Sequence, residues 1–379
     1  MAQRRRFTDG SQKIILDIKT DMHVPFVEFP LLAQAVRIII LATVGFVIAL
    51  ATTPLWLRVL RKYHIEKQIR PAANAPVYNR FHEKKAGTPT AGGLIIWVTV
   101  IGVTLIIGIL HFFFDGMWGY LDFIDRRETY LPLATLLITA LIGLMDDWYG
   151  VLRIGPSGGG LKVRHKLILY TVIAAVGAWW FFVKLGLTQL SVPFFGTFEI
   201  GWWYVPIFMF IIVAAAFSAN ETDGLDGLLG GVSLFAFVAL TTVAFVLGRY
   251  HLASFGGVMI GALLAFLWFN IYPARFFMGD TGSMSLGITI GVIAMLTDTA
   301  LLLPFFAIIL VLESLSVLIQ LGSRKLFGKK LFLSTPIHHH FEALGWPESQ
   351  VTMRFWIISA IFSALGLVLF FLTRGLTLN

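Results

Sequence analysis

Long apolar segments alternate with short polar segments along almost the whole chain. The apolar segments lie at 33–55, 91–113, 131–146, 167–184, 202–219, 228–248, 252–270, 283–297, 299–321 and 354–373. A helix needs about 20 residues to cross the hydrocarbon core of a bilayer. The pattern therefore predicts an all-α integral membrane protein with about ten transmembrane helices. In 322–353, basic residues alternate with large apolar ones, so we expect an interfacial or re-entrant segment before the last helix.

The composition supports a protein whose solvent is largely lipid. Hydrophobic residues make up 57% of the chain and charged residues 13%, and the mean hydropathy is +0.82. Cysteine is absent, which excludes disulfides, thiolate nucleophiles and Cys-ligated metal centres. We expect a tail at 1–30, without the apolar core and cleavage site of a signal peptide, followed by a single membrane domain at 31–379.

Five polar motifs occupy every second gap between the apolar segments. They are GTPTAGG at 87–93, LMDDWYG at 144–150, NETDGLDGL at 220–228, FMGDTGS at 277–283 and PIHHHFE at 336–342. Alternating threading brings all five to one face, and that face carries more Lys and Arg than the other. We therefore expect the motifs on the cytoplasmic face and both termini outside, although the basic N-terminus argues against this orientation. The net charge of +8 fits this bias and an anionic lipid or substrate better than nucleic acid.

The acidic residues are the strongest candidates for chemistry. Asp146 and Asp147 end an apolar segment, where a charge is costly and usually functional, and neighbouring helix positions point about 100° apart. Asp280 lies between two glycines just before a helix start, which suits phosphate at the helix end and Mg²⁺ at the carboxylate. The alternatives are a helix end in the headgroup zone for the Asp pair and a simple capped turn for Asp280.

A second acidic motif contains Asp223 and Asp226, three positions apart and so on one face of a helix, with Asn220 nearby. Neighbouring glycines leave room for a phosphate or a sugar. The alternative is a Gly-rich turn whose acids are simply solvated.

The basic candidates are three consecutive histidines, His338, His339 and His340, and the lysines near span ends. Consecutive histidines cannot converge on one metal from a regular helix, so we expect them to face a diphosphate rather than zinc. The alternative is a solvated polar loop. Lys85 and Lys166 suit the same role, or they are snorkelling anchors. Glu313, well inside the ninth segment, is expected to be a buried hydrogen-bonded helix contact, and direct catalysis is the alternative.

Acids, basic residues and Gly turns beside lipid suit a Mg²⁺-dependent transfer between a water-soluble diphosphate and a lipid phosphate. An ion-coupled transporter is the alternative from another class, but it would hold its carboxylates near the bilayer midplane. The sequence contains no phosphate loop, dinucleotide fingerprint or HExxH motif.

From about His82 to Arg354 the chain resembles the phospho-N-acetylmuramoyl-pentapeptide transferases, members of the polyprenyl-phosphate N-acetylhexosamine-1-phosphate transferase superfamily. The resemblance rests on HEKKAGTPTAGG, LMDDWYG, GLKVRHK, TDGLDGL, WFNIYPARFFMGDTGS, VLESLSVLIQ, PIHHHFE and GWPESQVTMRFW, which occur in the family's order. The PIHHHFE motif separates this branch from the N-acetylglucosamine-phosphate transferases, the nearer alternative.

The resemblance implies a usually dimeric, ten-helix protein of the bacterial inner membrane. It would transfer phospho-MurNAc-pentapeptide from UDP-MurNAc-pentapeptide to undecaprenyl phosphate, giving lipid I and UMP. By motif position, it implies Asp280 and Asp147 as Mg²⁺ ligands and Asp146, Asp147, Asp280 and His338 as catalytic residues. The implied substrate-binding residues are Lys85, Lys166, Asn220, Asp223, Asp226, Asn270, Phe277, His339 and His340.

Two motifs depart from the family's usual form. Ala91 stands where GTPTMGG has Met, and we expect a minor packing change. FSANETDGLDGL replaces NAVNLTDGLDGL, so Phe217 takes the place of an Asn and Glu221 that of an apolar residue. An added acid beside a diphosphate would either repel it or help to bind a metal.

Overall fold

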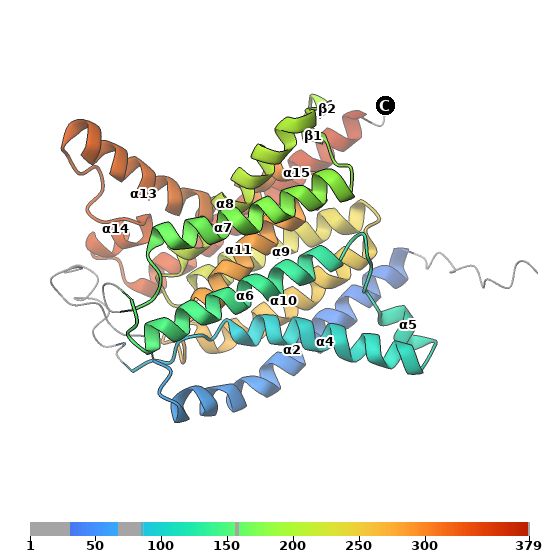
Figure 1. The fold of residues 1–379 in the computed structure, drawn as a ribbon, viewed down its shortest axis with the longest axis horizontal. Helices are drawn as coiled ribbons and strands as arrows, with labels where there is room; N and C mark the ends of the chain where they lie inside the picture. Colours follow the sequence, from blue (N-terminus) through green and yellow to red (C-terminus); the bar gives the residue numbers. More distant parts are fainter. Residues whose placement is uncertain (1–30, 67–84, 86, 156–158, 378–379) are drawn as a thin grey trace, which may run out of the picture.

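The structure is a computed structural model that describes residues 31–66, 85, 87–155 and 159–377, and it is built almost entirely of helices (Figure 1). In chain order the long helices are α2 (Leu31–Lys62), α4 (Leu94–Phe113), α6 (Tyr130–Val151), α7 (Val163–Trp179), α8 (Tyr204–Thr222), α9 (Leu228–Val246), α10 (Tyr250–Asn270), α11 (Asp280–Leu296), α13 (Ile308–Phe327) and α15 (Glu348–Thr377). Shorter helices are α5 (Met117–Leu121), α12 (Leu303–Phe306) and α14 (Ile337–Ala343). The predicted tail at 1–30 lies outside the described residues.

The helices correspond one by one to the predicted apolar segments. Within the described ranges, eight helices are long and apolar enough to cross a membrane. The eighth predicted segment forms α11, which is shorter at 17 residues, and the ninth forms α12 and α13, which meet at a bend of 91°. The all-α membrane fold is therefore confirmed, with a broken helix where the pattern predicted a continuous span.

Several helices extend beyond the apolar segments that predicted them. α2 continues to Lys62, seven residues past the predicted end at 55, and carries Arg58 and Arg61 with it. α6 continues to Val151, so Asp146 and Asp147 lie inside a helix rather than at its end. Hydropathy marks where lipid contact ends, whereas a helix stops only where its backbone hydrogen bonds stop.

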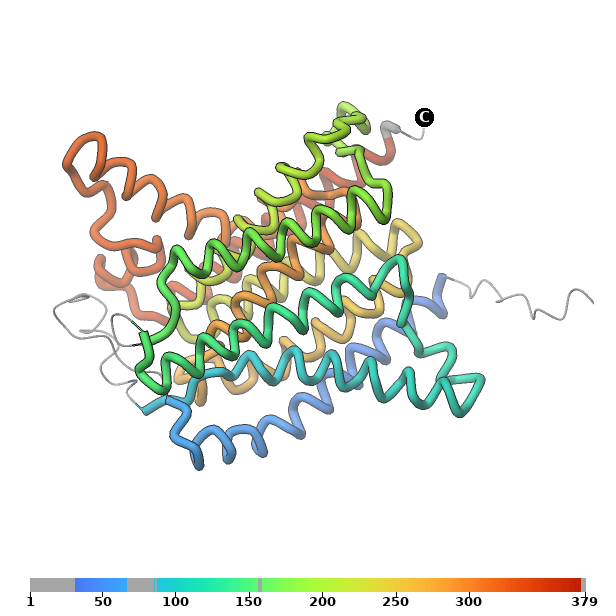
Figure 2. Tube along the Cα trace, viewed as in Figure 1, coloured from blue at the N-terminus to red at the C-terminus, as the bar shows by residue number. Residues whose placement is uncertain are grey.

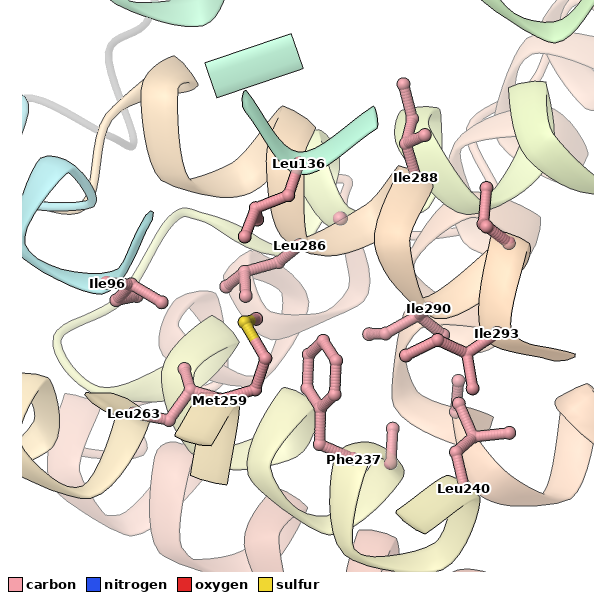
Figure 3. Close-up of a cluster of buried hydrophobic side chains, with 14 of the residues drawn as sticks. Ile96, Leu136, Phe237, Leu240, Met259, Leu263, Leu286, Ile288, Ile290 and Ile293 are labelled. Atoms are coloured by element: carbon pink, nitrogen blue, oxygen red, sulfur yellow. The ribbon is translucent and has the colours of Figure 1, made fainter. Parts of the chain in front are cut away.

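α11 is the central helix of the bundle, and every residue from Thr281 to Leu296 is buried. Figure 3 shows its apolar side chains packed among those of four other helices. The labelled neighbours are Ile96 of α4, Leu136 of α6, Phe237 and Leu240 of α9, and Met259 and Leu263 of α10, around Leu286, Ile288, Ile290 and Ile293 of α11. A helix that is apolar all round requires such a position. Its first residue, Asp280, is thereby held at a fixed place in the molecule.

The two ends of the bundle differ in what they carry. The starts of α7, α9, α11 and α15 lie at one end with the polar motifs, and α13 projects from the bundle there (Figures 1 and 2). α2 begins and α15 ends at the opposite end, which also holds the antiparallel hairpin of β1 (Gln189–Val192) and β2 (Gly196–Glu199). The motifs therefore converge as expected, while the membrane face that they occupy stays a prediction.

Candidate active site

Two motifs that are distant in sequence pair through their backbones at the motif end. The Gly92 and Gly93 amides donate to the carbonyls of Phe277 and Met278, each at 2.8 Å, and the Phe277 amide donates to the Pro89 carbonyl at 2.8 Å. Backbone groups buried in this way need partners, and each segment supplies those of the other. Backbone hydrogen bonds from the GTPTAGG motif therefore hold the FMGDTGS motif in place.

The start of α11 lies directly against α6 at Gly143. A Cβ at this position would come within 2.6 Å of the Cα of Thr281, so only glycine permits the approach. One turn along α6, the Asp147 carboxylate accepts the backbone amide of Asp280 at 2.9 Å and that of Thr281 at 3.0 Å. The first amides of a helix have no partner within it, and a carboxylate there is stabilising. Asp147 therefore fixes the N-terminus of α11 to α6.

The carboxylates of Asp146 and Asp280 meet at one ammonium group. Lys166 Nζ lies 2.8 Å from Asp146 Oδ2 and forms a second ion pair with Asp280. Asp146 also accepts the Leu161 amide, and Asn220 Nδ2 donates to Asp280 at 2.5 Å. The Asp146 side chain is only 2% exposed, so its charge depends on this partner. Sequence reasoning placed all four of Asp146, Lys166, Asn220 and Asp280 in the site, and the structure brings them together.

The carboxylates of this cluster are suitable ligands for a hard cation such as Mg²⁺, but they are few. In the part of the chain that the structure describes, no group of three or more His, Cys, Asp or Glu side chains could hold a metal ion. Mg²⁺, however, is usually held by one or two carboxylates with waters and substrate phosphates, and Asp146 and Asp280 already share a cation. Both oxygens of Asp147 accept amides, and its proposed metal contact stays a prediction.

A second buried cluster forms around Lys85. Its Nζ lies 2.6 Å from Asp226 Oδ1 and 2.5 Å from Glu348 Oε1, and 5.7 Å from the centre of the Phe277 ring. Glu348 Oε1 also accepts the Asp226 amide at 2.6 Å, while Asp226 Oδ2 accepts the Ala274 amide at 2.9 Å. The Lys85 ammonium group is thus held between two carboxylates and the face of a half-buried aromatic ring, which attracts a cation.

Asn270, at the end of α10, uses its amide on the backbone of the same region. Its Oδ1 accepts the Gly227 amide at 3.0 Å and its Nδ2 donates to the Phe276 carbonyl at 2.8 Å. The residue is buried and joins the TDGLDGL loop to the segment before α11. Asp223 is in the same loop, directly after α8. Asn270 therefore fixes the loop that carries Asp226 relative to the segment that carries Phe277.

The three histidines face three different partners. His338 Nδ1 lies 3.0 Å from Glu313 Oε2, His339 Nδ1 lies 2.7 Å from Glu342 Oε2, and His340 Nδ1 accepts the Leu333 amide at 3.2 Å. Each Nδ1 atom is thus engaged with a different group of the protein. Glu313 is fully buried, as predicted for a hydrogen-bonded helix contact, and its partner is a histidine of the motif.

Comparison with known proteins adds the family. Residues 129–298, from α6 to α11, match Glycosyl transferase family 4. Proteins named phospho-N-acetylmuramoyl-pentapeptide-transferase from Chloroflexus aggregans, Geobacillus thermodenitrificans and Thermoanaerobacter are 35%, 36% and 38% identical. These alignments cover 89%, 87% and 86% of this chain and 91%, 97% and 96% of the relatives. This chain belongs to the phospho-N-acetylmuramoyl-pentapeptide-transferase family.

The departures from the usual motifs of the phospho-N-acetylmuramoyl-pentapeptide-transferase family have distinct surroundings. Ala91 is buried in a left-handed conformation with φ of 61°. Phe217 is half-buried and packs against the apolar core. Glu221 lies at the end of α8, and its charge acts on His338. The Glu221 departure is therefore the one that changes the electrostatics of the site.

Sequence reasoning missed Glu348 as a member of the site. It belongs to GWPESQVTMRFW, follows Pro347 and begins α15, where an acidic residue is ordinary because it favours a helix N-terminus. Its ion pair with Lys85 joins residues far apart in the chain. A signal was present in the quoted motif, but only the fold identifies the partner.

Proposed function

We propose that this chain transfers phospho-MurNAc-pentapeptide from UDP-MurNAc-pentapeptide to undecaprenyl phosphate, releasing UMP and forming lipid I, the first membrane step of peptidoglycan synthesis. The observation that supports it best is the buried Asp146–Lys166–Asp280 cluster at the head of α11 in a member of this family. The acids crowd one end of the bundle, which favours an enzyme working at the membrane surface over a transporter with midplane carboxylates.

In this proposal Lys166 receives the diphosphate beside the start of α11. The ammonium group already neutralises two carboxylates, and it can turn toward phosphate oxygens that enter beside Asp280. Asp280 would hold Mg²⁺ with Asp147 as the expected second ligand, and the ion would neutralise charge on the diphosphate. Asn220 keeps Asp280 oriented through its hydrogen bond.

We assign the two neighbouring aspartates different tasks. Asp147 accepts two backbone amides and so positions α11. Asp146 is paired with a side chain that can move, and we propose that it accepts the proton of the lipid phosphate, whose second pKa is about 6 for a phosphate monoester. The phosphate oxygen thereby becomes the better nucleophile.

The Lys85 cluster suits the nucleotide end of the donor. The half-buried Phe277 ring offers a flat face for uracil, and Lys85 with Asp226 offers a donor and an acceptor beside it. We place Asp223, His339 and His340 toward the diphosphate and sugar. The excess of Lys and Arg on the motif face supports a cytoplasmic position for the active site. The family resemblance supports a homodimer surrounded by membrane lipid.

The test is UMP release by the purified protein in detergent, given UDP-MurNAc-pentapeptide, undecaprenyl phosphate and Mg²⁺. We expect release that needs all three components and is lost in Asp280→Asn. A parallel reaction contains UDP-N-acetylglucosamine as the donor. Release only from UDP-N-acetylglucosamine would assign the chain to the N-acetylglucosamine-phosphate transferases. No release from either donor would reject the transferase function.

A further inference from the structure

His338 and Glu313 form a pair that joins two separate elements. His338 belongs to α14 and Glu313 to α13, and their side chains are 1% and 0% exposed. The Nδ1 to Oε2 distance is 3.0 Å. A carboxylate buried so completely is costly unless it has a partner, and here the partner is the imidazole. Nδ1 is therefore committed to Glu313.

The opposite edge of the same imidazole points at the TDGLDGL loop. A Cβ at Gly224 would clash with the His338 ring, coming within 2.7 Å of Cε1 and closer still to Nε2. Within the described part of the chain, His338 Nε2 and Glu313 Oε1 are buried without a hydrogen-bond partner. A buried polar atom without a partner is costly, so Nε2 beside this loop is a candidate hydrogen-bond donor to a substrate.

Carboxylates face His338 from three helices. Glu313 approaches from α13, Glu342 from α14 itself and Glu221 from the end of α8, while the His339 ring lies 4.1 Å away, centre to centre. Burial alone lowers the pKa of His338, but Glu313, followed by Glu342 and Glu221, outweighs it and raises the pKa above the ordinary value of 6.5. The imidazole therefore stays protonated to higher pH than a free histidine.

We infer that Glu313 is a positioning residue that holds His338 as an imidazolium and directs its Nε2–H, past Gly224, at an anionic oxygen of the donor substrate. This inference rests on the proposed function, because it deepens the role of the histidine motif. Glu221, which replaces an apolar residue of the family's motif, strengthens the same charge from α8. The ligand class is a phosphate oxygen, since a buried cationic donor is stabilised most by an anion.

Two measurements on the full-length protein test the inference. The first is the titration midpoint of His338 by NMR of histidine-labelled protein in detergent, with its signal identified by loss in His338→Gln. The second is the pH dependence of kcat/KM for UMP release. The variants are Glu313→Gln, which removes the charge, Glu313→Asp, which keeps it, and Ser316→Ala. Ser316 is a matched control because it is buried on α13 and bonds only to the Glu313 carbonyl among the contacts described.

In Glu313→Gln we expect the midpoint to fall by about 1 to 2 pH units and the alkaline limb of kcat/KM to move with it. Glu313→Asp should largely restore both, and Ser316→Ala should match the parent protein. An unmoved midpoint, a midpoint that falls without the activity limb, or an Asp variant that behaves like Gln would overturn the inference. Inactivity of the parent protein would instead reject the proposed function, and the midpoint would still decide whether Glu313 sets the charge of His338.

Discussion

Asp147 holds Asp280 by its backbone, with Asp147 Oδ1 2.9 Å from the Asp280 amide nitrogen. The neighbouring Asp146 instead pairs with Lys166, which also pairs with the Asp280 side chain. Asp280 is thus fixed on its backbone side by one aspartate and shares a cation with the other. The roughly 100° between adjacent helix positions makes this division of roles geometrically natural.

Asp147→Asn should weaken the attachment of α11 to α6. An amide keeps one acceptor but presents an NH₂ group to a backbone amide, so we expect a loss of about 0.5–2 kcal/mol of unfolding free energy and at least a tenfold loss of turnover. Thermal unfolding in detergent and UMP release measure the two effects. Asp115→Asn, an exposed residue at the other end, is the control. Full stability with lost turnover would contradict a positioning role for Asp147.

Gly143→Ala should inactivate the enzyme without changing any polar group. The added methyl group would collide with the first turn of α11 and displace Asp280 from Lys166. We expect turnover to fall by about 100-fold, since misplacement by about 1 Å costs that much. Gly150→Ala lies on the same helix in open space and should be nearly neutral. Equal activity of the two variants in UMP release would refute this reasoning.

Lys166→Gln should leave two carboxylates facing each other without a cation. Their mutual repulsion favours the binding of another cation between them. We therefore expect millimolar Mg²⁺ to raise the unfolding temperature of this variant more than that of the parent, while turnover falls by about 100-fold. Lys184→Gln, at the other end of the same span beside Trp179, controls for general charge loss. An identical Mg²⁺ shift in all three proteins would argue against a cation site here.

Glu348→Gln should affect donor binding more than chemistry. Glu348 holds both the Lys85 ammonium and the Asp226 amide, and its neutral analogue leaves Lys85 with weaker support. We expect KM for the UDP substrate to rise about tenfold, which corresponds to about 1.4 kcal/mol, with a smaller change in kcat. Steady-state kinetics of UMP release measure both constants, and Glu199→Gln, at an exposed residue of the opposite end, is the control. A changed kcat with constant KM would place Glu348 elsewhere in the reaction.

The Glu313–His338 pair should make stability depend on pH in a known direction. The folded-state pKa of His338 is raised above 6.5, so the stability from the pair is complete below about pH 6.5 and is lost as pH rises through the folded pKa. The difference in unfolding temperature between the parent and Glu313→Gln should therefore be largest in mild acid and shrink toward alkaline pH. Thermal unfolding between about pH 5.5 and 9 measures it. A difference that grows with pH would have the wrong sign.

Hydropathy predicted the helices well because lipid contact demands long apolar segments with satisfied backbones. It did not predict that α2 would extend to Lys62 or that α13 would turn by 91° from α12, since polar residues continue a helix and bends arise from packing. The convergence of the motifs followed from the alternation of spans alone.

The sequence predicted which residues belong to the site, but it did not predict which of them form ion pairs with each other. Asp146, Lys166, Asn220 and Asp280 were each marked by charge or polarity beside an apolar segment, and they do meet. The partners Glu348 for Lys85 and Glu313 for His338 depend on how α15 and α13 cross the other helices. No spacing within one segment encodes such a crossing.

The backbone pairing between Pro89, Gly92 and Gly93 and the Phe277–Met278 segment joins parts of the chain separated by nearly half its length. Synthesis proceeds from the N-terminus, so the GTPTAGG amides are made long before the carbonyls that receive them. The motif end can therefore be completed only after the first residues of α11 have emerged and entered the bundle. Assembly of the catalytic end is a late event in the biosynthesis of the protein, although one of its halves lies near the start of the chain.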